Sequence, residues 1–145
     1  MPDYFKTVIY KIFCKDTNIT GKYIGSTTNF NKRKYKHKSD CSNENNNLKV
    51  YQYIRENGGF ENFEMVIIEE YPSDNKKEAN KRERFWIEKL KANLNSNIPT
   101  RTVKEYHKEK IICECGCEIL KKHLKRHQES KKHINLMAII TKNNF

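Results

Sequence analysis

Long apolar runs are absent from this sequence of 145 residues. The longest, residues 65–68 and 136–140, fall far short of the roughly 20 residues that a membrane-spanning helix needs. The start of the chain also lacks the basic stretch followed by an apolar core that marks a secretory signal. We therefore expect no membrane span and a reducing intracellular compartment, the cytoplasm or the nucleus.

Acidic residues are scarce as well. The chain has 18 Asp and Glu against 29 Lys and Arg, a formal net charge of +11. Such a chain repels itself unless its usual partner is a polyanion, and nucleic acid is the commonest polyanion. Hydrophobic residues still make up 36% of the chain, which is too many for a disordered protein. We expect a folded protein that binds nucleic acid or another acidic partner.

The cysteines do not favour a disulfide framework. They number five, which is odd, and three of them lie within residues 113–117. In a reducing compartment such a cluster is typical of a metal site. Cys14 and Cys41 stand alone, and we expect them to be ordinary thiols.

Strands are predicted at three places. Residues 7–14 and 22–26 are rich in β-branched and aromatic side chains and are close enough in sequence to form an antiparallel hairpin. Residues 63–71 form the strongest strand pattern, apolar on both faces in the middle, so we expect that strand to be covered on both sides.

Helices are predicted at residues 29–38, 48–57 and 75–94. Asn29 suits the start of the first, and the glycines at 58 and 59 suit the end of the second. The third carries an amphipathic stripe that must face a core. The predicted organisation is then a domain over residues 1–98, a basic linker over 99–110, and a small unit over 111–145.

Two tyrosines and two basic side chains stand out in the first domain. Tyr10 and Tyr23 lie in the two strands of the predicted hairpin, where they can face each other on one side of the sheet. Arg33 and His37 are four apart on the next helix and share a face suited to one phosphate. Packing alone offers other interpretations: half-buried sheet aromatics with solvated hydroxyls, and a solvated basic helix face.

Glu83 lies within the apolar stripe of the third helix, between Ala79 and Trp86. Burying an unpaired carboxylate costs several kcal/mol, so Glu83 needs a cation as its partner. The sequence leaves two alternatives open, an ion pair with an arginine such as Arg33 and a bound metal ion.

These residues belong to a longer series of motifs. In order, the motifs are Val8-Ile9-Tyr10, Tyr23-Ile24-Gly25-Ser26, Arg33 and His37, Glu83-Arg84-Phe85-Trp86-Ile87, and Leu94-Asn95. The series resembles the GIY-YIG nuclease family over about residues 7–97. Val8 departs from the family's pattern, which has glycine there, and this change affects the strand more than the site.

The resemblance implies an α+β fold, a small three-stranded antiparallel sheet flanked by helices, that cuts phosphodiester bonds in DNA. It implies that Glu83 holds one Mg²⁺ or Mn²⁺ ion, which stabilises the leaving oxygen. By the same resemblance, Asn95 follows Leu94 at the end of the catalytic helix.

The resemblance also assigns roles to the residues around the attacking water. Tyr10 would activate or orient the water, with Tyr23 beside it in the same hydrogen-bond network. Arg33 would bind the scissile phosphate, and His37 would assist proton transfer or contact the phosphate. A tyrosine titrates near pH 10 in water, so Tyr10 can act as a base only if its pKa is lowered.

The C-terminal unit looks like a Cys₂His₂ zinc finger. Zn²⁺ prefers four nitrogen or sulfur ligands in a tetrahedron, and Cys113, Cys115, His127 and His133 have close to the usual spacing. The interval between the two histidines requires the helix to loosen near residues 129–130. Cys117 is the main competitor as a ligand, and His123 is expected at the surface because it follows Cys117 too closely.

The finger is basic and is expected to touch phosphate. One finger reads only about three base pairs, so it adds grip more than sequence choice. It is loosely similar to the short fingers that follow GIY-YIG domains in proteins of large DNA viruses and mobile elements. The residues expected at the DNA are Lys121, Lys122, Lys125 and Arg126.

The sequence thus predicts a metal-dependent DNA endonuclease with a structural zinc finger. The alternative from another class is a noncatalytic DNA-binding protein that keeps the fold and has lost the chemistry. Within the enzyme class, a homing-type cutter of one duplex site and a nuclease selective for branched DNA both stay open. A protein-binding finger is the alternative for the C-terminal unit.

Overall fold

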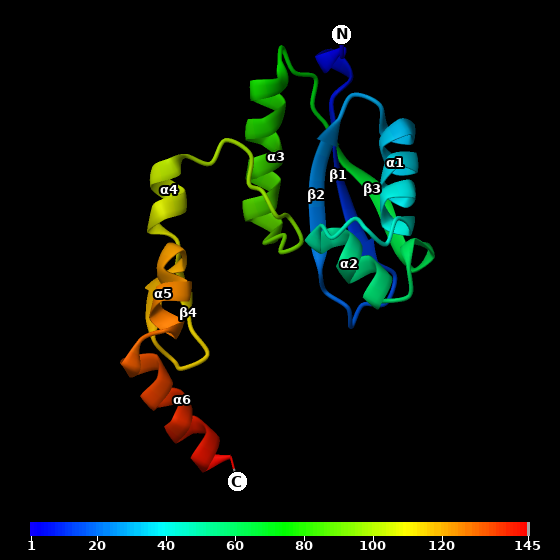
Figure 1. Cartoon of the computed structure of the whole chain (residues 1–145). Coiled ribbons are helices and arrows are strands. Elements are labelled where there is room, and N and C mark those ends of the chain that lie inside the picture. Colours follow the sequence, from blue (N-terminus) through cyan, green and yellow to red (C-terminus); the bar gives the residue numbers. More distant parts are fainter. Residues whose placement is uncertain (145) are drawn as a thin grey trace. The chain divides into compact units, whose positions relative to one another are not determined.

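The computed structural model describes residues 1–144, which form two compact units (Figure 1). The first unit is Met1–Thr100, and the second begins at Arg101. None of the helices in the described part of the chain is both long and apolar enough to cross a membrane.

The first unit is built on a three-stranded antiparallel sheet, as predicted. Its strands are β1 (Val8–Cys14), β2 (Lys22–Thr27) and β3 (Phe63–Glu70), in the order β2-β1-β3. The expectation that the strand at 63–71 is covered on both sides was wrong. Ile67, in the middle of β3, is 43% exposed, so the helices leave part of one face of this strand uncovered. β3 is also an edge strand, because the order β2-β1-β3 places only β1 beside it.

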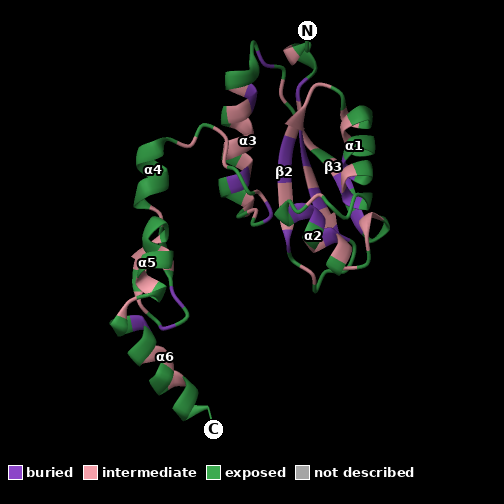
Figure 2. Cartoon of the chain, in the orientation of Figure 1, coloured by how far each residue is buried: buried purple, intermediate pink, exposed green. Residues whose placement is uncertain are grey.

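Helices cover both faces of this sheet (Figures 1 and 2). The helices α1 (Phe30–Ser42) and α2 (Lys49–Glu56) pack on the face that carries Tyr10 and Ile12. The helix α3 (Lys76–Leu90) packs on the face that carries Ile9. Short 3₁₀ turns, η1 (Tyr4–Lys6) and η2 (Phe60–Asn62), precede β1 and β3.

Local signals set several of the helix boundaries. The Asn29 side chain accepts a hydrogen bond from the N–H of Lys32 and so caps α1. Gly58 follows the end of α2 with a positive φ of 95°, a conformation that glycine adopts without strain. Both boundaries were predicted from the sequence.

The predicted end of the third helix was wrong. α3 stops at Leu90, because Lys91 takes the left-handed conformation with φ 52°. Leu94 is therefore not helical, although its side chain is buried in the core on the other side of the sheet. Its N–H donates to the carbonyl of Lys22 in β2, 3.0 Å away.

The second unit contains short elements around a β-hairpin. Helix α4 (Val103–Lys108) lies in the segment expected as a linker, and the Thr102 and Glu105 side chains form a capping box at its start. The other elements, in chain order, are β4 (Lys110–Ile112), β5 (Glu118–Leu120), η3 (Lys121–His123), α5 (Leu124–Gln128) and α6 (Lys131–Asn143).

Candidate functional site

A cleft of about 340 Å³ in the first unit brings together residues that are far apart in the sequence. Tyr23, Arg33, Glu83 and Asn95 line it, and they come from β2, α1, α3 and the loop after α3. Tyr10, a direct partner of Arg33, is fully buried. The cleft therefore has a polar wall with a second layer of polar side chains behind it.

The hairpin register places both tyrosines on one face of the sheet. Tyr10 pairs with Gly25, and Ile12 pairs with Tyr23, so the two rings are diagonal neighbours with centroids 6.3 Å apart. Gly25 has no Cβ, and the Tyr10 hydroxyl occupies the space that a Cβ would need. Tyr10 is not the half-buried aromatic that packing alone suggests, because no part of it is exposed.

Arg33 and His37 project from α1 onto the Tyr10 hydroxyl. The Arg33 Nε–H donates to the Tyr10 oxygen over 3.1 Å, and His37 Nε2 lies 2.8 Å from the same oxygen. His37 Nδ1 is bonded to the hydroxyl of Tyr51, 3.0 Å away. Since His37 is fully buried and both of its ring nitrogens are occupied, it has no atom free to contact a phosphate.

Burial sets the protonation states of these groups. It raises the pKa of Tyr10 well above its usual range, and it lowers the pKa of His37 to about 3 together with the positive charge of Arg33. Burial also opposes the charge of Arg33, but the Tyr10 and Tyr23 hydroxyls outweigh it and raise the Arg33 pKa. The site thus holds neutral phenols, a neutral imidazole and a charged guanidinium.

Glu83 reaches the same cleft from α3. The Ser26 hydroxyl donates a 2.6 Å hydrogen bond to Glu83 Oε2, and burial raises the pKa of the carboxyl group. The ion pair with Arg33 does not form, and among the described residues Glu83 has no cationic partner within ion-pair distance. A carboxylate held partly out of water without a cation suits a metal ion in the cleft.

Asn95 binds the edge of the sheet rather than ending a helix. Its side-chain oxygen accepts from the N–H of Ile24 over 3.0 Å, and its side-chain nitrogen donates to the Ile24 carbonyl over 2.7 Å. The amide group thus pairs with β2 as a neighbouring strand would. Through Ile24, it holds Tyr23 and Gly25 in place.

Three residues of the site were not assigned a role from the sequence. Ser26 lay inside a quoted motif, but nothing in the motif points to Glu83. Tyr51 recurs at helical spacing with Leu48 and Ile54, a pattern that predicts a helix but assigns no role to the hydroxyl group. Asp40 lies three residues after His37, so helical spacing was the one signal that pointed to it.

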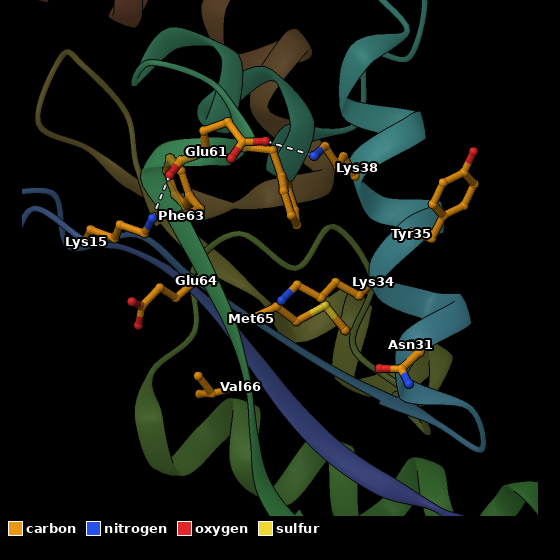
Figure 3. A pocket seen from close by; sticks show the side chains of 11 residues that line it. Lys15, Asn31, Lys34, Tyr35, Lys38, Glu61, Phe63, Glu64, Met65 and Val66 are labelled. Atoms are coloured by element: carbon orange, nitrogen blue, oxygen red, sulfur yellow. Dashed lines mark hydrogen bonds and ion pairs between the residues drawn. The ribbon is translucent and has the colours of Figure 1, made fainter.

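A larger cavity, of about 720 Å³, lies between α1 and β3 (Figure 3). Lys15, Lys34 and Lys38 line it together with apolar side chains such as Met65. None of the predicted site residues lines this cavity, so the volume of a cavity does not identify where these residues meet.

The second unit brings Cys113, Cys115, His127 and His133 together. One ligand atom from each residue lies within 4.8 Å of the other three. Tetrahedral Zn²⁺ with sulfur and nitrogen ligands separates its ligand atoms by about 3.6 Å, so a small contraction around the ion suffices. Glu114 Oε1 lies 3.6 Å from His133 Nε2, as a carboxylate beside a metal-bound histidine often does.

The other two ligand candidates lie outside this cluster. Cys117 uses its carbonyl to accept from the N–H of Cys113, and His123 is exposed. The helix breaks where the spacing requires it, since α5 ends at Gln128 and the Ser130 side chain caps α6. The basic residues expected at DNA all have exposed side chains: Lys121, Lys122, Lys125 and Arg126.

Comparison with known proteins gives consistent matches to the first unit. The family model for the GIY-YIG catalytic domain matches residues 6–96. A solved structure of the catalytic domain of homing endonuclease I-TevI is 28% identical and has a TM-score of 0.53, covering 67% of this chain and 100% of that one. A mutant catalytic domain of intron endonuclease I-TevI is 30% identical, with a TM-score of 0.54 and coverage of 67% and 99%.

No curated protein sequence gives a significant match. The family model nevertheless covers more than half of the chain, and each solved structure covers 67% of it. The chain therefore belongs to the GIY-YIG nuclease family and is an endonuclease of that type.

Proposed function

We propose that this endonuclease hydrolyses phosphodiester bonds in DNA at the cleft between β2, α1 and α3, with a divalent metal ion at Glu83. The observation that carries the proposal is the convergence of Tyr23, Arg33 and Glu83 on one cleft. Hydrolysis of a phosphodiester needs an oriented water, a cation at the phosphate, and help for the leaving oxygen. The three side chains supply a site for each.

Mg²⁺ or Mn²⁺ fits the donors that the cleft offers. Mg²⁺ commonly binds one or two carboxylates and fills its remaining positions with water and phosphate oxygens. Glu83 supplies one carboxylate, oriented by Ser26 and free of any protein cation. When bound there, the ion would stabilise negative charge on the leaving oxygen.

Arg33 and the tyrosines would bind the phosphate and orient the attacking water. Arg33 would bind the scissile phosphate, because its Nε is bonded to Tyr10 while the side chain also lines the cleft. Tyr23 faces the cleft and would contact the attacking water directly. Tyr10 is too deeply buried to contact the water. Because its pKa is raised, Tyr10 would stay neutral and would accept a proton only while it donates its own to a neighbour.

The second unit would add DNA affinity. Cys113, Cys115, His127 and His133 would hold one structural Zn²⁺ ion and fix α5 against the hairpin. The exposed basic side chains of η3 and α5 would then contact phosphates. A homing-type, duplex-cutting activity is favoured over a branched substrate by the two solved structures, which are both of the homing endonuclease I-TevI.

Cleavage of supercoiled plasmid tests the catalytic proposal. The wild type and Glu83→Gln are compared in Mg²⁺, in Mn²⁺ and in EDTA, with Glu78→Gln on the same helix as a matched control. Nicking or linearisation that needs metal, is lost in Glu83→Gln and persists in Glu78→Gln supports it. Absence of cleavage with either metal, alongside DNA binding that weakens steeply with salt, would support the noncatalytic alternative.

A further inference from the structure

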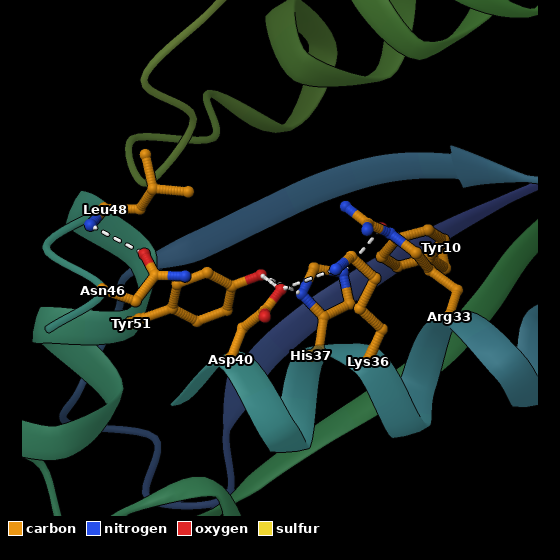
Figure 4. A network of polar contacts seen from close by, with 8 residues as sticks. All are labelled: Tyr10, Arg33, Lys36, His37, Asp40, Asn46, Leu48 and Tyr51. Carbon is orange, nitrogen blue, oxygen red and sulfur yellow. Dashed lines mark hydrogen bonds and ion pairs between the residues drawn. The ribbon is translucent and has the colours of Figure 1, made fainter. Parts of the chain in front are cut away.

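A row of hydrogen bonds runs from the catalytic cleft to the surface of α1 (Figure 4). The Tyr10 hydroxyl is bonded to His37 Nε2 at 2.8 Å, and His37 Nδ1 to the Tyr51 hydroxyl at 3.0 Å. The Tyr51 hydroxyl donates in turn to Asp40 Oδ2 at 3.3 Å. Tyr23, which lines the cleft, packs beside Tyr10 at the other end, with the two ring centroids 6.3 Å apart.

The acceptor at the Asp40 end sets the direction of the bonds in this row. Arg33 can only donate, and an ionised Asp40 can only accept. Because Tyr51 donates to Asp40, its oxygen accepts from His37, so the proton of the neutral imidazole is on Nδ1. His37 Nε2 then has a free lone pair that faces the proton of Tyr10.

The row places three polar side chains in the core, where apolar side chains would stabilise the fold at lower cost. Tyr51 is 3% exposed and Tyr10 and His37 are fully buried, whereas an apolar core would avoid the cost of satisfying them. The titratable and charged groups around the imidazole are Tyr10 from β1, Tyr23 from β2, Arg33, Lys36 and Asp40 from α1, and Tyr51 from α2.

We propose that His37, Tyr51 and Asp40 form a proton relay that carries the proton of the attacking water from the tyrosine pair to solvent. This inference rests on the proposed hydrolysis. It adds Tyr51 and Asp40 to the residues that serve the reaction, although neither is part of the motifs that identify the family.

The relay balances in protons and charge. As the water oxygen forms its bond to phosphorus, its proton moves to Tyr23 and the Tyr23 proton moves to Tyr10. The Tyr10 proton passes to His37 Nε2 while the Nδ1 proton passes to Tyr51, and Tyr51 gives its own proton to Asp40. The bridging oxygen that leaves phosphorus takes a proton from solvent water, and Asp40 releases one to solvent.

Two features favour a through-going relay over a stored imidazolium. The imidazolium is costly here, because burial and Arg33 lower the pKa of His37 to about 3. If His37 Nε2 accepts one proton while Nδ1 releases another, the imidazole ring stays neutral. The Asp40 side chain is 26% exposed and paired with Lys36 at 3.6 Å, so it can exchange a proton with solvent.

The first test compares Tyr51→Phe with Tyr53→Phe. Both tyrosines lie on α2 and both use their hydroxyls, but Tyr53 accepts from the N–H of Gly21, away from the relay. The single-turnover cleavage rate at saturating DNA should fall about 100-fold in Tyr51→Phe, the lower range for a lost proton-transfer group, and stay near wild type in Tyr53→Phe. DNA affinity should be unchanged in both.

The second test separates proton uptake from positioning at the end of the row. Asn at position 40 can still accept from Tyr51 but cannot take up a proton, so Asp40→Asn should keep the Nδ1–H tautomer and lose the rate. Lys36→Gln controls for the broken ion pair. The tautomer is measured directly from the side-chain ¹⁵N shifts of His37 in the wild type and in each variant.

The outcomes distinguish the relay from the function on which it rests. An active wild type with the proton on Nε2, or an Asp40→Asn variant that cleaves at the wild-type rate, overturns the relay alone. A wild type that cleaves no DNA in Mg²⁺ or Mn²⁺ overturns the proposed function and the relay with it. A proton on Nδ1 together with slow Tyr51→Phe and Asp40→Asn supports both.

Discussion

The hydroxyl group of Tyr10 occupies the space that a Cβ atom would need at Gly25, its partner on the neighbouring strand. The glycine therefore allows a buried phenol to lie flat across β2 and reach Arg33 and His37. This contact explains why a glycine occupies the third position of the motif Tyr23-Ile24-Gly25-Ser26.

Gly25→Ala should accordingly remove cleavage while the chain still folds. The new methyl group would push the Tyr10 hydroxyl away from His37 and Arg33, and small displacements of catalytic groups cost about 100-fold or more in rate. Plasmid cleavage and the fluorescence of Trp86, the single tryptophan in the chain, measure the two effects. A variant with normal cleavage would show that Tyr10 does not need its present position.

Ser26→Ala should raise the concentration of Mg²⁺ or Mn²⁺ needed for cleavage. The Ser26 hydroxyl orients Glu83 through a 2.6 Å hydrogen bond, and loss of such a supporting contact costs about 10- to 100-fold in metal affinity. Titration of the metal at fixed DNA measures the shift. Ser42→Ala, which removes a hydroxyl from the exposed end of α1, serves as the control.

Cys113→Ser should release zinc and weaken DNA binding while the catalytic unit stays folded. Cys113 lies in the four-residue cluster, whereas Cys117 does not, so Cys117→Ser should bind one zinc per chain like the wild type. Zinc content, DNA affinity and Trp86 fluorescence distinguish the three proteins. Equal zinc loss in both variants would move the ligand set toward Cys117.

Acid should destabilise the catalytic unit in part through His37. Its pKa is about 3 in the folded protein against 6.5 in a free side chain, so the unfolded state binds the proton more tightly. The stability from the neutral imidazole is complete above pH 6.5 and is lost as pH falls from there toward 3, by up to about 1.4 kcal/mol per pH unit.

Urea unfolding followed by Trp86 fluorescence at pH 7 and pH 4.5 measures this dependence. His37→Gln removes the titrating group, so its unfolding free energy should fall less between the two pH values. An equal fall in variant and wild type would place the acid sensitivity in other groups.

Local patterns predicted much of the fold and part of the site. The hairpin, the Asn29 cap and the glycine end of α2 depend on neighbouring residues, and these signals are visible in the sequence. The exposure of Ile67 on β3 was missed, because it depends on which part of the strand the helices cover in the folded domain. The early end of α3 was missed too. The left-handed conformation that ends the helix falls on Lys91, and lysine, unlike glycine, has no preference for that conformation.

The site shows the same division between local and long-range information. Helical spacing put Arg33 and His37 on one face, and the apolar stripe made Glu83 conspicuous. Ser26, Tyr51 and Asp40 were missed because each of them is bonded to a side chain on another element: Ser26 to Glu83, Tyr51 to His37, and Asp40 to Tyr51. Such roles become visible only once the chain is folded.

The pairing of Asn95 with Ile24 also affects the tendency of the chain to associate with other molecules through the edge of its sheet. A β-strand at the edge of a sheet exposes backbone groups that can recruit strands from other molecules. Asn93, Leu94 and Asn95 satisfy such groups on β2 at Lys22 and Ile24, so the loop after α3 works as a guard against self-association. Leu94 and Asn95, which also line the cleft, thus help to keep β2 from pairing with strands of other molecules.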